Sequence, residues 1–133
     1  PPALLDRVDV LIPNRIELAQ LADSATPEEI SAVEAIARAL PVPTVVVTLG
    51  AQGALLVRDA DALHIPAPSV KVVDTTGAGD AFCGALATGL ARGISIEEAM
   101  LQAVHAGAIS TTRSGAQPSL PTATEVTALM GET

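Results

Sequence analysis

Short apolar runs alternate along the chain with longer segments in which apolar residues recur every three or four positions. The runs at residues 8–12, 44–48, 54–57, 63–65 and 70–73 have the length of strands. The run at 44–48 is β-branched throughout, which is typical of a strand that is buried on both faces of a sheet. These runs predict the strands of one sheet.

Helices are predicted between the strands from capping signals and periodicity. Residues 14–22 predict a short helix that begins at Asn14. Three further starts show a hydroxyl residue followed three positions later by glutamate, which is the capping-box pattern: Thr26 with Glu29, Ser95 with Glu98, and Thr122 with Glu125. With an Ala- and Leu-rich segment at 81–91, they predict helices at 27–40, 81–91 and 96–111 and a short one after 122.

The order of these elements determines the expected fold class. Strands that alternate with helices are typical of an α/β fold in which a mostly parallel sheet is flanked by helices. A length of 133 residues is that of one ordinary domain, and the chain shows no internal repeat. We therefore expect residues 1–133 to belong to a single α/β domain.

Composition and charge exclude several classes of function. Aromatic residues make up only 1% of the chain, so it has no stacking platform for single-stranded nucleic acid. A net charge of −8 disfavours binding to the DNA or RNA backbone, so a bound phosphate must be held locally. No apolar run approaches the ~18 residues of a membrane span, and no signal-peptide pattern is present. We expect a cytoplasmic protein without nucleic-acid or membrane partners.

Residues 74–80 form the segment with the clearest chemical meaning. A predicted strand ends there, Gly77 and Gly79 flank Ala78, and a predicted helix follows. Such a turn aims unpaired N–H groups and the positive end of a helix at one point, which favours an anion. Asp80 adds a carboxylate that would repel a phosphate but can take a proton from a hydroxyl attacking a phosphoryl group.

A plainer interpretation of Asp80 remains open on spacing alone. A carboxylate in the first turn of a helix stabilises that helix by ~0.3–1 kcal/mol without any catalytic role. Two other phosphate-binding motifs do not fit the sequence. A P-loop requires lysine where Asp80 stands, and a dinucleotide fingerprint requires glycine where Phe82 stands.

Residues 73–82, Val-Asp-Thr-Thr-Gly-Ala-Gly-Asp-Ala-Phe, closely resemble the C-terminal signature of the ribokinase (PfkB) family of carbohydrate kinases. Three further segments resemble the family in the same order: Asn14-x-x-Glu17, residues 48–53 and residues 112–119. The resemblance covers essentially the whole chain and implies a ribokinase-like α/β fold.

The resemblance also implies a role for each matching position. Asp80 would be the catalytic base, and the N–H groups of Gly77, Ala78 and Gly79 would form the anion hole for the γ-phosphate of ATP. The nucleotide site would include Thr48, Gly50 and Gly53, and Asn14 and Glu17 would act near Mg²⁺ and the phosphates, Glu17 through water. On spacing alone, Asn14 and Glu17 can equally form a capping box.

Family members also use a monovalent cation, usually K⁺. The matching positions here are Asp74, Thr76, Ser110, Arg113, Gly115 and Ser119, several of them through backbone carbonyls. His105 lies on a predicted helix that would border the adenine, and an ordinary core or surface histidine is the alternative.

The implied reaction is ATP-dependent phosphorylation of a sugar hydroxyl, with D-ribose giving ribose 5-phosphate. Another sugar, a sugar phosphate or a nucleoside as acceptor, and a catalytically silent nucleotide-binding module, remain alternatives. Members of the family carry a larger N-terminal portion with most sugar contacts and a lid that mediates homodimers. The resemblance therefore implies that this chain is the C-terminal ATP-binding and catalytic part, inactive in isolation.

Overall fold

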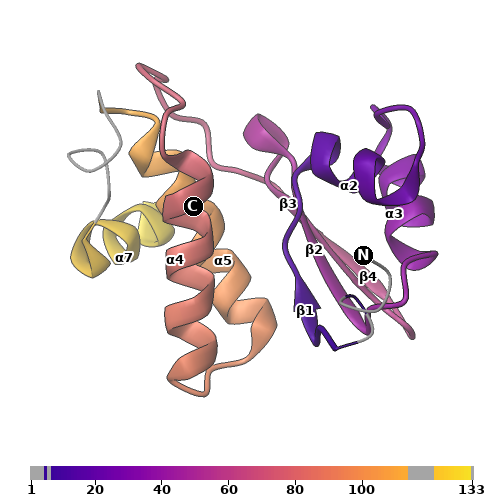
Figure 1. Ribbon diagram of the computed structural model, residues 1–133. Coiled ribbons are helices and arrows are strands. Elements are labelled where there is room, and N and C mark those ends of the chain that lie inside the picture. The colour runs from indigo at the N-terminus through magenta and orange to yellow at the C-terminus, as the bar shows by residue number, and fades with distance from the viewer. Residues whose placement is uncertain (1–4, 6, 114–121, 133) are drawn as a thin grey trace. The chain divides into compact units, whose positions relative to one another are not determined.

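The computed structural model describes residue 5, residues 7–113 and residues 122–132 (Figure 1). The chain divides into two compact units, residues 1–64 and residues 65–133, and each unit has its own hydrophobic cluster. In the described ranges, no helix is both long enough and apolar enough to cross a membrane.

The first unit is built on a four-stranded sheet in the order β1-β2-β3-β4. Its strands are β1 (Val10–Leu11), β2 (Thr44–Thr48), β3 (Ala54–Arg58) and β4 (Ala62–Ile65). β1 and β2 are parallel, whereas β2 and β3 are antiparallel. The 3₁₀ turn Gly50–Gln52 is too short for the crossover that a parallel neighbour of β2 would need. The α/β class is confirmed. The β2–β3 hairpin adds an antiparallel pair to the sheet that was expected to be mostly parallel.

Two helices, α2 (Arg15–Ala22) and α3 (Ile30–Arg38), pack on the sheet of the first unit (Figure 1). Val45 and Val47 of β2 share one hydrophobic cluster with Leu18 of α2 and Val33 of α3. Val46, which points to the opposite face of the strand, is also 0% exposed. The prediction that this strand is buried on both faces is therefore confirmed.

The start of α3 differs from the prediction. The helix begins at Ile30, and Glu29 is the N-cap residue without a side-chain capping bond. Pro27, expected as the first helical residue, is buried in a non-helical lead-in. Residues 25–28 are non-helical, so the Thr26 capping box does not form.

The second unit contains three described helices, α4 (Ala78–Ala91), α5 (Ile96–Ser110) and α7 (Ala123–Glu132). α4 and α5 lie side by side and make the most extensive contact between elements (Figure 1). Ser95 and Thr122 both form the predicted N-cap hydrogen bond. At Ser95, the hydroxyl accepts from the Glu98 amide at 3.2 Å. Thr122 and Glu125 bond reciprocally, each at 3.2 Å.

The strand predicted at 70–73 does not form. Val72 and Val73 are both 57% exposed, and residues 66–77 contain no strand. Instead of entering a ladder, the amides of Val73 and Asp74 both donate to the Thr111 carbonyl, at 2.6 and 3.0 Å. A β-branched run becomes a strand only with a neighbouring strand, and the described residues supply none at this point.

The close contact of α4 with α5 yields a test of packing. A Cβ added at Gly89 would lie 2.9 Å from the Ala99 Cβ and 3.0 Å from Ile94 Cδ1. We expect Gly89→Ala to lower the free energy of unfolding by about 1–3 kcal/mol, because overpacking exceeds the helix propensity gained. The control is Gly84→Ala in the same helix, where nothing lies within 4 Å. Urea denaturation should show the control unchanged or more stable; equal destabilisation of both variants would contradict the packing argument.

Candidate active site

The first unit gathers five predicted site residues at the carboxyl ends of β1 and β2. Thr48 ends β2, its amide donates to the Pro13 carbonyl at 3.0 Å, and it forms a parallel bridge with Asn14. Beyond Thr48, Gly50 has a φ of 59° with nothing within 4 Å of its Cβ position, and Gly53 has a φ of 93°. The carboxyl ends of parallel strands are where α/β folds bind ligands.

Asn14 and Glu17 form the capping box that the sequence left open. Asn14 Oδ1 accepts from the Glu17 amide at 2.8 Å, and Glu17 Oε1 accepts from the Asn14 amide at 3.0 Å. Both side chains are exposed, and no donor to Glu17 Oε2 is found among the described residues. A carboxylate oxygen facing solvent suits an indirect, water-mediated contact with Mg²⁺, so capping and metal binding are compatible.

The turn after β2 is also held by two side chains that sequence reasoning missed. Arg15 Nη1 donates to the Leu49 carbonyl at 3.3 Å, and its other terminal nitrogen donates to the Gln52 side chain. His64 Nε2 donates to the Gln52 carbonyl at 2.6 Å. Because Arg15 and Gln52 are 37 residues apart in sequence, only the fold reveals these contacts.

The glycine turn of the second unit leads directly into α4. Gly77 is the N-cap residue with a φ of 84°, and the helix starts at Ala78, earlier than the predicted Ala81. The Ala78 amide donates to the Thr75 carbonyl at 3.2 Å. In the described part of the chain, the amides of Gly77 and Gly79 have no acceptor. Two of the three predicted anion-hole amides are thus unpaired.

Asp80 lies in the first turn of α4 and is exposed. The Cβ position of Gly79 has nothing within 4 Å. The space at this Cβ position is therefore open among the described residues, and the Asp80 side chain is accessible to solvent. The helix-dipole interpretation of Asp80 holds at the same time, because both roles use the same position.

Predicted cation ligands of the second unit lie near the end of α5. Asp74 Oδ1 accepts from the Thr76 amide at 2.9 Å, which shapes the turn. The Thr111 carbonyl, next to Ser110, accepts both amide bonds from residues 73 and 74 and ties this turn to α5. Arg113 forms an ion pair with Glu125, so its backbone remains the part suited to a cation. Gly115 and Ser119 lie outside the described residues.

Ser110 provides the test of whether an ion fits there. Its side chain is 0% exposed, and its hydroxyl has no hydrogen-bond partner in the described part of the chain. A buried hydroxyl without a partner carries a cost of ~1–3 kcal/mol, which a cation or an ordered water would remove. Oxygen donors of this kind suit a hard cation, so the Ser110 hydroxyl fits the predicted ion.

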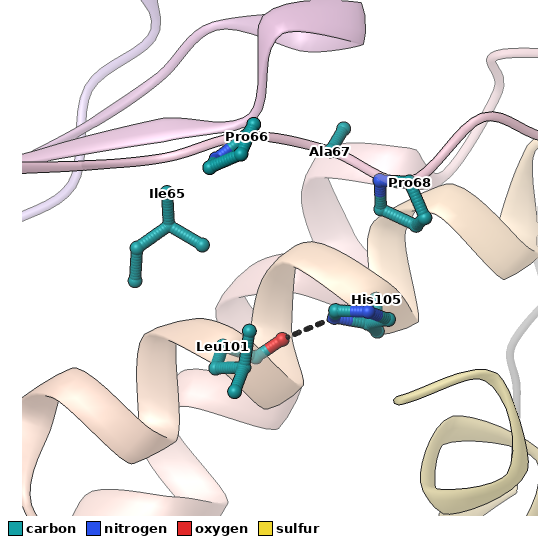
Figure 2. A pocket seen from close by; sticks show the side chains of 6 residues that line it. All are labelled: Ile65, Pro66, Ala67, Pro68, Leu101 and His105. Carbon is teal, nitrogen blue, oxygen red and sulfur yellow. Dashed lines mark hydrogen bonds between the residues drawn. The ribbon is translucent and has the colours of Figure 1, made fainter. Parts of the chain in front are cut away.

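His105 lines a pocket of about 230 Å³ together with Ile65, Pro66, Ala67, Pro68 and Leu101 (Figure 2). The His105 side chain is 2% exposed, and its Nδ1 donates to the Leu101 carbonyl at 2.8 Å. The carbonyl can only accept, so Nδ1 carries a proton. Figure 2 shows the ring below Pro68 and beside Leu101, whose carbonyl a dashed line joins to it. His105 is both a core histidine and a pocket residue.

Comparison with known proteins identifies the family. Residues 2–123 match the pfkB family carbohydrate kinase. The chain belongs to the pfkB family of carbohydrate kinases. A ribokinase from Lactococcus lactis subsp. lactis is 39% identical over 130 residues, which are 97% of this chain and 41% of the relative.

Solved structures of pfkB-family kinases share the fold. The structure of Arabidopsis thaliana ribokinase complexed with ribose and ATP matches 98% of this chain and 43% of its own, with 36% identity and a TM-score of 0.86. Escherichia coli phosphofructokinase-2 in complex with potassium matches 98% and 43%, with 29% identity and a TM-score of 0.82. The chain therefore spans less than half the length of these pfkB-family relatives.

Proposed function

We propose that this chain supplies the ATP-binding and catalytic part of a sugar kinase that transfers the γ-phosphoryl group of ATP to a sugar hydroxyl. The observation that carries the proposal is the turn before α4. There, the unpaired amides of Gly77 and Gly79 and the exposed Asp80 carboxylate belong to one short segment. Apart from stabilising the start of the helix, a carboxylate beside an anion site has no role in a module that only binds nucleotide, which disfavours the catalytically silent alternative.

Asp80 would act as general base. It takes the proton of the sugar hydroxyl as the hydroxyl oxygen bonds to the γ-phosphorus and the bond from that phosphorus to the bridging oxygen breaks, releasing ADP. The amides of Gly77 and Gly79 would hold the negative charge that builds up on the transferring group. Positioning and electrostatic stabilisation dominate phosphoryl transfer, so a preformed turn contributes more than any single proton transfer.

The nucleotide would be held by the remaining predicted residues. Thr48, Gly50 and Gly53 would line its phosphates, where little side chain stands in the way. The pocket at His105 is apolar and contains two prolines, which suits the flat face of a purine.

Two cations belong to the proposal. Asn14 and Glu17 would hold Mg²⁺ near the phosphates, and Mg²⁺ neutralises phosphate charge when bound. The monovalent site would use Asp74, Thr76, Ser110, Arg113, Gly115 and Ser119. The potassium complex of E. coli phosphofructokinase-2 supports a K⁺ site in this family, and the buried Ser110 hydroxyl supports it here.

D-ribose is the acceptor we favour, with its 5-hydroxyl as the nucleophile. Similarity to ribokinases of 36–39% supports this choice. The match to a phosphofructokinase keeps other sugars and sugar phosphates as the second candidate. Most acceptor contacts are expected in the part of the relatives that this chain does not span.

The test uses a chimera, the replacement protein, in which this chain takes the place of the matched 130 residues of the L. lactis ribokinase. We expect the resulting replacement protein to form ADP in the presence of ribose, MgATP and K⁺, while the purified chain alone binds ATP weakly at most and forms none. Coupled ADP assays and calorimetry measure both. A replacement protein that folds and binds ATP without any phosphorylation would favour the silent module; ADP production by the chain alone would contradict its dependence on the rest of the kinase.

A further inference from the structure

The turn after β2 is exposed, and within the turn it is held by backbone hydrogen bonds alone. Gly50 and Gly53 both have positive φ angles, and Gly50, Ala51 and Gln52 are exposed. The local bonds are Leu49 N–H to the Gly53 carbonyl at 2.8 Å and two longer bonds of 3.0 and 3.2 Å. Glycines in an exposed turn have access to many backbone conformations, so the turn needs support from outside.

That support comes from helix α2 and strand β4, and it converges on Gln52. The Gln52 side chain accepts from Arg15, and its carbonyl accepts from His64. Arg15 also donates to the Leu49 carbonyl, so one guanidinium contacts both ends of the 3₁₀ turn. Its Nε is buried without a partner among the described residues, although the Arg15 residue as a whole is half-buried.

Arg15 is also the residue that follows Asn14. It is the first residue of α2, whose cap is formed by Asn14 and Glu17. One side chain therefore joins the start of α2, proposed to hold Mg²⁺, to the turn proposed to hold the ATP phosphates. A planar guanidinium with several donors is suited to hold two acceptors in a fixed arrangement, which a single ammonium cannot do.

We propose that Arg15, Gln52 and His64 form a brace that positions the nucleotide turn relative to the Mg²⁺ residues of α2. Arg15 is a positioning residue, because it acts through the turn rather than on the reacting atoms. This inference rests on the proposed function for its consequence, but the brace itself is testable without nucleotide.

The experiment compares Arg15→Ala, Arg15→Lys, Gln52→Ala and the double variant Arg15→Ala/Gln52→Ala with Arg38→Ala. Arg38 is a matched control in the same unit, because it also donates to backbone carbonyls, those of Arg58, Asp59 and Asp61, at the other hairpin turn. Calorimetry on the purified chain, well below its unfolding midpoint, gives the ATP affinity with and without Mg²⁺. Hydrogen exchange gives the opening of amides 49–53.

We expect Arg15→Ala to weaken ATP binding about tenfold, since a turn that is correctly shaped a tenth of the time loses that factor in affinity. It should also reduce the factor by which Mg²⁺ tightens binding, which general destabilisation would leave unchanged. Arg15→Lys should lose less, Gln52→Ala should add little to Arg15→Ala, and Arg38→Ala should bind ATP as the parent chain does. Equal losses in Arg15→Ala and Arg38→Ala would contradict the proposal.

Hydrogen exchange separates this inference from the proposed function. Amides 49–53 should exchange faster in Arg15→Ala and at the parent rate in Arg38→Ala. Absent ATP binding by the parent chain, with or without Mg²⁺, would concern the nucleotide site of the isolated chain; these exchange rates still decide the brace, and ADP formation by the replacement protein decides the proposed function. Unchanged exchange at 49–53 in Arg15→Ala would overturn it.

Discussion

Replacing Asp80 with asparagine in the replacement protein is expected to lower turnover by about 10²–10⁴-fold while ATP affinity stays nearly constant. Asparagine keeps the shape of the side chain but cannot accept the proton of the sugar hydroxyl. The side chain is exposed at the start of α4, so the substitution creates no cavity and leaves the unpaired amides of the turn in place. Steady-state kinetics and ATP titration provide the two measurements.

The control for Asp80→Asn is Glu98→Gln, which removes a carboxylate from the first turn of α5. Both substitutions should cost ~0.3–1 kcal/mol of stability through the helix dipole. Only Asp80→Asn should affect turnover. A large loss of ATP binding in Asp80→Asn, or turnover comparable to that of Glu98→Gln, would show that Asp80 serves the helix alone.

Replacing Gly79 with alanine is expected to reduce turnover by about 10²-fold without destabilising the fold. The added methyl group meets nothing within 4 Å, and alanine is favoured over glycine in a helix by up to ~1 kcal/mol. The same methyl would occupy the space through which a phosphoryl group reaches the amides. The thermal unfolding midpoint of the replacement protein should therefore rise while its turnover falls.

Gly84→Ala, five residues further along α4, is the matched control for Gly79→Ala. It adds the same methyl group to the same helix, again with nothing within 4 Å. Stability should rise similarly in both variants, and turnover should fall only in Gly79→Ala. Turnover within a factor of about two of the parent in Gly79→Ala would remove the anion-hole role from this turn.

The local parts of both candidate sites could be predicted because each is encoded by neighbouring residues. The Asn14–Glu17 cap spans four positions, and the turn from Asp74 to Asp80 spans seven, so residue identity alone nearly determines their geometry. The pfkB-family signature then assigns the chemistry, and the family match confirms the recognition.

What the sequence could not show depends on contacts across the fold. The run at 70–73 has strand propensity, but the amides of Val73 and Asp74 bond to Thr111, which lies nearly forty positions away. The start of α3 is shifted to Ile30 and Pro27 is buried ahead of it, and neither can be inferred from a capping pattern. Arg15 looks like any surface arginine until β2 brings Gln52 beside it.

The small-residue contact at the far end of α4 bears on the chemistry at its near end. Gly89 and Asp80 are nine residues apart, roughly 13 Å along the helix axis. A Cβ at Gly89 would lie only 2.9 Å from the Ala99 Cβ, so the absence of a side chain at Gly89 sets how closely α4 approaches α5. Because an α-helix is stiff, a displacement of α4 at Gly89 also changes its orientation at Asp80. A substitution at Gly89 should therefore lower activity indirectly, and an activity assay alone would not distinguish this effect from a catalytic defect.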